Sequence, residues 1–263
     1  MRSLFLILTI VFPNIICAQN YHFLKELNKD TIITDSKIAV LIANTNYNND
    51  SLDLRNPSND VKAISRSLEK LEFDIITKEN VTLKELQKII VEFQDTIDSY
   101  DFGLIYYAGH GFEDENGNAY IIPADIPGRN SLQKNCESVN DLVNLLGSLK
   151  KNCILILDAC REKGNNGLEK PIRITDPRNI KLAYSTSSGK TASDELFKNY
   201  QSTLYATALA HYLENANLSP TTIHKILSNT YKYVEQITKN TAHEQWPSQF
   251  FGPEIDGIIL KTE

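Results

Sequence analysis

Short apolar runs recur along the chain and predict the strands of a sheet. Three of them, Lys37–Ala43, Phe102–Tyr107 and Cys153–Leu157, are almost continuous, as is typical of strands buried on both faces. Four weaker runs complete the set of expected strands: Phe73–Thr77, Ala119–Pro123, Lys181–Thr186 and Ile255–Leu260.

Segments with apolar residues at helical spacing lie between these runs. The first begins at Asn56 and Pro57, where Asn is expected to cap the helix and Pro to occupy its first turn. Thr82 and Glu85 form a capping-box pattern at the start of the next helix. Further helices are expected near residues 138–149, 203–215 and 221–238.

This alternation predicts an α/β fold with a mostly parallel central sheet and helices on both faces. Right-handed crossovers then bring the carboxyl ends of the strands to one edge of the sheet. Residues 161–179 are polar, with glycines, prolines and mixed charges, and are expected to form a long loop. We expect one domain at 36–263, preceded by a less patterned lead-in segment at 19–35.

Residues 1–18 have the features of a signal peptide. Arg2 supplies a positive start, Leu4–Phe12 is an apolar core too short to span a membrane, and Ala18 is a small residue suited to precede the cleavage point. We therefore expect an exported protein, periplasmic or secreted. The alternatives are an uncleaved anchor, an N-terminal core strand and, ranked lower because the preceding residue is not small, a lipidated Cys17.

Composition excludes several other classes of protein. A chain of 263 residues, 41% of them hydrophobic, is long enough for a large core. The formal net charge is -6 and no long basic run occurs, which argues against binding of nucleic acid. After the leader, no apolar stretch approaches the length of a membrane span. The His and Cys spacings of zinc sites do not occur, so we expect neither a metal site nor a cofactor.

Two of the buried strands run into residues that can carry out covalent chemistry. His110 follows one strand in the sequence Ala-Gly-His-Gly, and Cys160 follows another in the sequence Asp-Ala-Cys-Arg. Ligands of open α/β sheets bind at the carboxyl ends of strands. An imidazole beside a thiol can accept its proton, and the backbone N–H groups of Cys160 and Gly111 are suited to stabilise an oxyanion. This set of groups is sufficient for acyl transfer.

Each of the two residues has a plainer explanation when it is taken alone. A cysteine after a strand is usually part of the core, and a single histidine is usually a satisfied polar group. Their joint placement at two strand ends favours catalysis. A cysteine phosphatase is excluded, because Asn166 stands where its phosphate cradle requires arginine.

The sequence around both residues resembles the catalytic motifs of the caspase superfamily. These motifs are YYAGHG at 106–111 and LDACR at 157–161, with the spacing of about 50 residues that is typical of caspases. The likeness continues in consistent order over roughly residues 36–262 and is greatest to the paracaspases and their bacterial relatives. Four more segments carry it: LRNPSNDVKAISRSLEKLEFD at 54–74, GHGFEDENGNAYIIPAD at 109–125, YSTSSGKTASD at 184–194 and QWPSQFFG at 245–252.

The resemblance implies a caspase-like three-layer sandwich and a cysteine endopeptidase with Cys160 and His110 as its dyad. Asp158 stands where caspases have Gln, and metacaspases and paracaspases carry an acid there. Their pockets accept Arg or Lys before the scissile bond. By the same resemblance, Asp158, then Asp60, then Asp194 are expected in that pocket. The plainer roles are a cap or ion pair for Asp158, a helix-dipole contact for Asp60 and a solvated loop charge for Asp194.

The expected partner is therefore a protein or peptide substrate with Arg or Lys before the scissile bond. The loop at 161–179 carries Lys163, Lys170, Arg173 and Arg178, so self-cleavage within it is a further expectation. A homodimer, as in paracaspases, and a calcium requirement, as in many metacaspases, both stay open. The competing function is a catalytically silent caspase-fold module that binds or regulates other proteins.

Overall fold

The structure is a computed structural model, and it describes most of the chain from residue 32 onward. The described ranges are 32–127, 134–159, 162–163, 178–186, 202–219, 221–241, 244–250 and 252–260. The expected signal peptide at 1–18 lies outside these ranges, as do Cys17, Cys160, Asp194 and most of the predicted loop at 161–179. None of the helices within the described ranges has the length and apolarity needed to cross a bilayer.

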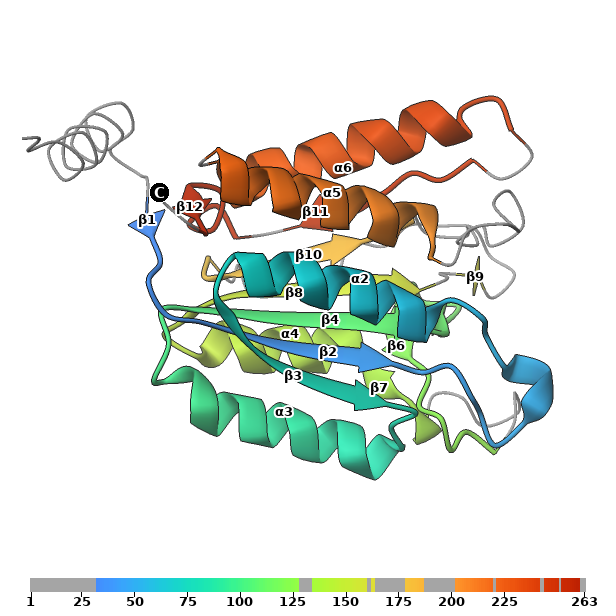
Figure 1. Ribbon diagram of the computed structural model, residues 1–263. Coiled ribbons are helices and arrows are strands. Elements are labelled where there is room, and N and C mark those ends of the chain that lie inside the picture. The colour runs from blue at the N-terminus through green and yellow to red at the C-terminus, as the bar shows by residue number, and fades with distance from the viewer. Residues whose placement is uncertain are drawn as a thin grey trace, which may run out of the picture.

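A six-stranded sheet forms the middle layer of the molecule (Figure 1). Its strand order is β11-β10-β8-β4-β2-β3, and every neighbouring pair is parallel except β10 and β11. The predicted mostly parallel sheet is therefore confirmed. The strands are β2 (Lys37–Ala43), β3 (Phe73–Glu79), β4 (Phe102–Gly109), β8 (Asn152–Ala159), β10 (Ile180–Tyr184) and β11 (Ser248–Phe250).

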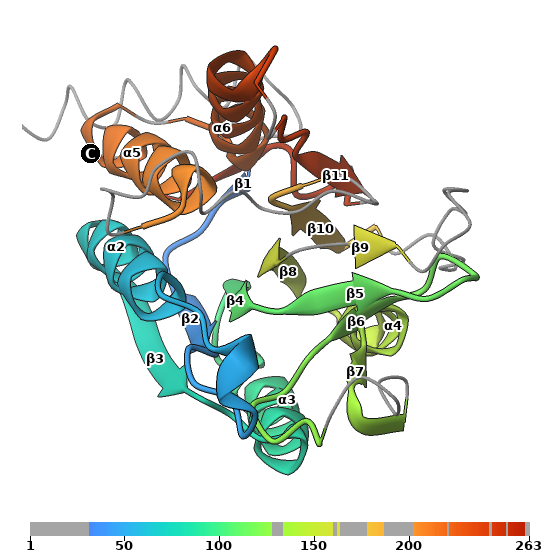
Figure 2. The same cartoon turned by 90° about the vertical axis from the view of Figure 1, so that its right-hand side faces the viewer.

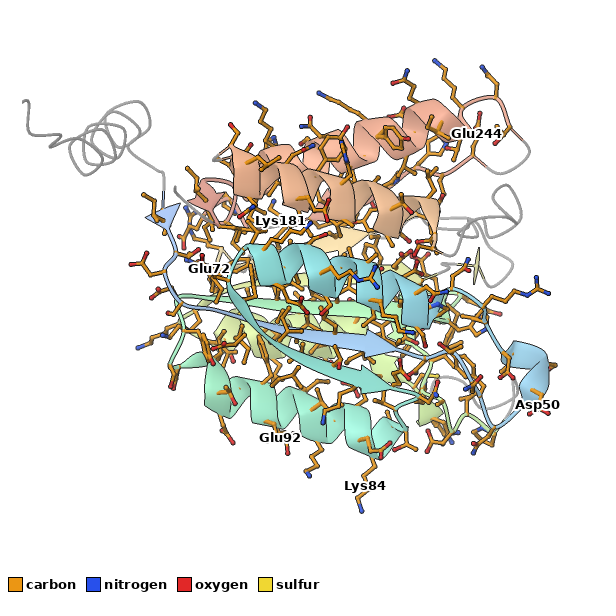
Figure 3. The ribbon with its side chains drawn as sticks, in the orientation of Figure 1. Asp50, Glu72, Lys84, Glu92, Lys181 and Glu244 are labelled. Atoms are coloured by element: carbon orange, nitrogen blue, oxygen red, sulfur yellow. The ribbon has the colours of Figure 1, made fainter. Side chains whose placement is uncertain are left out.

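Helices cover both faces of this sheet, which confirms the three-layer sandwich (Figures 1 and 2). Alternate side chains of each buried strand point to opposite faces, so β2 contributes Leu41 to one core and Val40 to the other. Lys84 and Glu92 lie on the outer side of α3 (Leu83–Ile97), away from the sheet (Figure 3). One face carries α2 (Pro57–Lys70), α5 (Leu204–Leu218) and α6 (Ile223–Thr238); the other carries α3 (Leu83–Ile97) and α4 (Val139–Ser148).

A smaller, four-stranded sheet lies beyond the carboxyl edge of the main sheet (Figure 2). Its order is β7-β6-β5-β9, with β5 (Gly111–Glu113), β6 (Ala119–Ile121), β7 (Glu137–Ser138) and β9 (Glu162–Lys163). Two chain segments cross from the main sheet into the small one, β4 to β5 and β8 to β9. Residue 110 separates β4 from β5 in the chain, and residues 160 and 161 separate β8 from β9.

The structure corrects three expectations about the elements and adds one strand that the sequence did not predict. Asn56 precedes α2 without a side-chain capping bond, whereas the capping box of Thr82 and Glu85 is present as predicted. The expected loop at 161–179 begins with the strand β9. The last expected strand, at 255–260, shrinks to β12 (Ile258–Ile259), which pairs with β1 (Ile32–Ile33) instead of the main sheet. The strand that joins the main sheet is β11, which is too short and too polar to show a strand pattern.

Candidate active site

The register of two neighbouring strands aligns the described residues that precede positions 110 and 160. Gly109, the last residue of β4, lies opposite Ala159, the last residue of β8. In the small sheet, Phe112 of β5 lies opposite Glu162 of β9. Positions 110 and 160 are therefore flanked by paired residues on both sides. Paired strands run about 4.8 Å apart, so the carboxyl ends of β4 and β8 lie side by side, as do the strands β5 and β9.

The imidazole of His110 is oriented by a backbone carbonyl. Its Nε2 lies 2.8 Å from the carbonyl oxygen of Leu52. A carbonyl oxygen only accepts, so Nε2 carries the proton in this contact and the Nδ1 lone pair is left to accept one. This is the tautomer that a general base needs.

The backbone of His110 is held by two tyrosine hydroxyls. Its N–H donates to the Tyr47 hydroxyl at 2.9 Å, and the Tyr107 hydroxyl lies 3.0 Å from its carbonyl oxygen. The Tyr47 ring also packs against the imidazole, with centroids 5.0 Å apart. Both tyrosines are buried. His110 is therefore fixed through its backbone and its ring.

The Leu52 carbonyl is presented by a loop of residues 44–56, which we call the strap loop. Its 3-10 helix η1 (Asp50–Leu52) is capped by Asn49, whose side chain accepts the Ser51 N–H. The loop is joined to the core by the N–H of Asn48, which donates to Ala124 at 2.8 Å. Asp50 marks its outermost turn, beyond the carboxyl ends of the strands (Figure 3).

The N–H of Gly111 is oriented toward the β9 side of β5. The Ile122 N–H donates to the His110 carbonyl at 3.0 Å, so this pair occupies a hydrogen-bonded position of the antiparallel ladder. Gly111 lies opposite Ile121 at the next position, which is of the other type. Its N–H therefore points away from β6 and toward the strand that follows Cys160 in the chain.

Two of the predicted pocket acids converge on one threonine. The Thr203 N–H donates to Asp60 Oδ1 at 2.7 Å, and the Thr203 hydroxyl donates to Asp158 Oδ2 at 2.8 Å. Asp60 is 1% exposed and Asp158 is 5% exposed. Thr203 is also the N-cap of α5, so both carboxylates lie at the positive end of a helix. Asp60 thus joins α2 to α5 and does more than offset the dipole of its own helix.

A buried tyrosine supports the second of these acids. The Tyr106 hydroxyl donates to Asp158 Oδ2 at 2.9 Å. Burial raises the pKa of Tyr106 well above its usual 10.0, and the charges of Asp158 and Asp60 raise it further. The phenol therefore stays protonated and acts as a hydrogen-bond donor to the carboxylate.

The comparisons with known proteins agree with this geometry. A family model described as the caspase domain matches residues 36–252. The chain belongs to the caspase domain family. Its fold is also that of a caspase-1 from Spodoptera frugiperda, with a TM-score of 0.66 at 15% identity over 86% of this chain and 90% of the other.

Paracaspase relatives are more similar in sequence. The human mucosa-associated lymphoid tissue lymphoma translocation protein 1 is 31% identical over 173 residues, which make up 64% of this chain. Its mouse homologue is 30% identical over 165 residues, or 61% of this chain. The matched parts cover 20% and 19% of these two proteins, so the caspase domain described here spans about a fifth of their length.

Two further thiols of this caspase domain, those of Cys136 and Cys153, are buried. Burial raises the pKa of Cys153 from 9.0 to about 12. The pKa of Cys136 is also raised to about 12, by burial and by the nearby charge of Asp125. Since the thiolate is the nucleophile, neither is reactive near neutral pH. The nucleophile proposed from the sequence remains Cys160, which lies outside the described residues.

Sequence reasoning found some of the site and missed the rest. The structure brings His110 and Gly111 to the carboxyl edge, and Asp60 and Asp158 to Thr203; Asp194 lies outside the described residues. The missed participants are Tyr47, the Leu52 carbonyl and Thr203. A backbone carbonyl has no sequence signature, and a threonine before a helix indicates no more than a cap.

Proposed function

We propose that this caspase domain is a cysteine endopeptidase with Cys160 as its nucleophile and His110 as its general base. The observation that carries the proposal is the register of β4 and β8, in which Gly109 lies opposite Ala159. The residue that follows each of these is one member of the dyad. The Leu52 carbonyl supports the same roles, because it leaves Nδ1 of His110 to accept a proton.

The chemistry proceeds in two balanced halves. His110 Nδ1 takes the thiol proton, and the thiolate attacks the scissile carbonyl carbon. The oxyanion accepts hydrogen bonds from the N–H groups of Gly111 and Cys160. The tetrahedral intermediate collapses, the C–N bond breaks, and the imidazolium gives its proton to the leaving amine. Water then attacks the thioester with His110 again as base, which releases the acid and regenerates the thiol.

Specificity for Arg or Lys before the scissile bond is the second part of the proposal. Asp60 and Asp158 are two buried carboxylates held by the same threonine, at the edge where the dyad is proposed. Burying like charges together is costly, and a cationic side chain offsets that cost. An arginine guanidinium forms charge-assisted and often bidentate bonds to carboxylates. Such a pocket rejects an acidic side chain.

Self-cleavage between residues 161 and 179 belongs to the same proposal. Lys163 lies in β9, and Arg178 forms a 2.8 Å ion pair with Glu254, so Lys170 and Arg173 are the preferred positions. Intact-mass spectrometry of the wild-type protein and Cys160→Ala tests this expectation. Fragments are expected from the wild type alone. Identical uncut masses would remove self-processing from the proposal.

Export remains a proposal that rests on residues 1–18. Secretion assays with and without this segment test it. Retention of the full-length protein inside the cell would contradict it.

The decisive experiment is a matched panel of fluorogenic peptides that end in Arg, Lys, Asp or Leu. We expect the Arg and Lys peptides to be cleaved, and Cys160→Ala or His110→Ala to abolish cleavage. Preference for the Asp peptide would contradict the proposed Arg/Lys specificity and leave the proposed dyad in place. A folded wild-type protein that cleaves none of the peptides would favour the silent binding module instead.

A further inference from the structure

Two contacts on the ring of His110 come from the strap loop, residues 44–56. Leu52 supplies the carbonyl that accepts from Nε2, and Tyr47 supplies the ring beside the imidazole. We infer that Tyr47 and Asp53 are positioning residues: they hold the strap loop so that the Leu52 carbonyl selects the tautomer and orientation of His110. The inference rests on the proposed function, in which His110 is the general base.

The contacts form a closed circuit. The Tyr47 N–H donates to Asp53 Oδ1 at 2.8 Å, and Asp53 directly follows Leu52. From Leu52 the circuit passes to His110 Nε2, and from the His110 N–H it returns to the Tyr47 hydroxyl. The bond from Tyr47 to Asp53 closes the inner part of the loop, beside a 2.8 Å bond from the Leu54 N–H to the Thr45 carbonyl. Breaking it therefore loosens both contacts with His110.

On the side of His110 away from the strap loop, the backbone at the end of β4 has little room to move. The Tyr107 hydroxyl lies 3.0 Å from the His110 carbonyl and 2.9 Å from that of Ile122, and shares its proton between them. A Cβ atom on Gly109 would lie 2.4 Å from the Tyr107 hydroxyl and 3.0 Å from that of Tyr47. Both hydroxyls thus crowd the backbone just before His110. With the backbone held, the strap loop determines the direction of the ring.

The role of Asp53 can be separated from a role in stability. The residue is exposed, and exposed carboxylates contribute little to the free energy of unfolding. The Leu52 carbonyl itself is present in every variant, so its position has to be altered through its neighbours. Asp53→Asn keeps an oxygen that accepts the Tyr47 N–H, whereas Asp53→Ala removes it. The two variants therefore isolate the hydrogen bond from the charge.

Displacement of the carbonyl changes the chemical step in a defined direction. The carbonyl favours the Nε2–H tautomer and also stabilises the imidazolium. Without the carbonyl, the imidazolium is less stable and the pKa of His110 falls. The limb of the pH profile that reports His110 therefore moves to lower pH. The direction is the same for a neutral dyad and for a thiolate–imidazolium ion pair. Tyr47 and Asp53 act on His110 through the strap loop, so we expect kcat to change more than KM.

The test compares Asp53→Ala, Asp53→Asn and Tyr47→Phe in the full chain. We measure kcat and KM on an Arg peptide across pH, and ¹⁵N shifts of histidine-labelled protein, with His110→Ala to identify the His110 signals. We expect Asp53→Ala and Tyr47→Phe to lower kcat roughly tenfold, to move the His110 limb to lower pH and to shift the Nε2 signal. Asp53→Asn should stay within about twofold of wild type.

Two results would overturn the inference. One is an Asp53→Ala protein with wild-type kcat, pH profile and ring ¹⁵N shifts. The other is an equal loss in Asp53→Ala and Asp53→Asn, which would assign the effect to charge. If the wild-type protein cleaves no peptide, the proposed function fails, and the ¹⁵N shifts of Asp53→Ala still decide whether the strap loop orients His110.

Discussion

The two ends of the central sheet differ in how their buried charges are paired. At the amino end, Lys181 of β10 has a side chain 4% exposed and forms a 2.7 Å ion pair with Asp256. Lys37 of β2 is also buried there, and its ammonium group donates to the carbonyls of Thr34 and Asp35. At the carboxyl end, Asp60 and Asp158 carry the same sign and are joined through Thr203.

The difference separates stability from function. Pairing a buried ammonium with a carboxylate or with carbonyl oxygens offsets its desolvation, which is what a structural site requires. Two buried carboxylates that accept from the N–H and the hydroxyl of one threonine repel each other. Arrangements of this kind are concentrated at functional sites. Substitutions at the two ends are therefore expected to have opposite effects on stability and on activity.

The largest effect is expected at the dyad. His110→Ala removes the proposed general base, and we expect kcat/KM to fall by a factor on the order of 10³ or more with an unchanged melting temperature. His224→Ala is the matched control, because His224 is half-exposed and lies 3.4 Å from Asp256 at the other end of the molecule. Equal activity of the two variants would break the assignment of chemistry to the carboxyl edge.

The next effect is expected at the pocket acids. Asp158→Asn should reduce transition-state stabilisation for an Arg peptide by roughly 2–5 kcal/mol, by analogy with truncated buried charge pairs. Asp60→Asn should have a smaller effect of the same sign. Because each variant removes one of two like charges, the free energy of unfolding should be unchanged or higher. Urea titrations measure the free energy of unfolding, and kcat/KM on the Arg peptide measures transition-state stabilisation. An Asp158→Asn protein that is less stable but keeps its specificity would show that Asp158 serves stability and not substrate binding.

A smaller effect, confined to stability, is expected at the amino end. Asp256→Asn leaves the buried Lys181 ammonium without its carboxylate, and we expect a loss of about 1–3 kcal/mol in the free energy of unfolding. The double variant Lys181→Met with Asp256→Asn should recover most of it, since both charges of this ion pair are then removed. Both proteins should keep wild-type kcat/KM. A specificity change in either one would mean that the two ends are coupled.

The sequence predicted the parts of the molecule that depend on local pattern. The three continuous apolar runs became β2, β4 and β8, because a strand buried on both faces has to be apolar at every position. The strand ends at His110 and Cys160 followed from the same runs. By contrast, β11 has only three residues and depends on its pairing with β10, so it was missed.

The same limit applies within the site. Asp60 and Asp158 were proposed from resemblance, and their convergence on Thr203 depends on the packing of α2 against α5, which has no local pattern. The Leu52 carbonyl belongs to a residue whose side chain indicates no chemistry. Its role follows only from the path of the strap loop.

The most direct test is covalent labelling by peptide chloromethyl ketones that end in Arg or in Asp, in which the thiolate forms a C–S bond and chloride leaves. Mass spectrometry of the digested protein identifies the labelled thiol. We expect one adduct, on Cys160, formed by the Arg ketone and slowed in His110→Ala and Asp158→Asn. Burial raises the pKa of Cys136 and of Cys153 to about 12, so both thiols stay unlabelled near neutral pH. An adduct on either buried thiol, or preferential labelling by the Asp ketone, would contradict it.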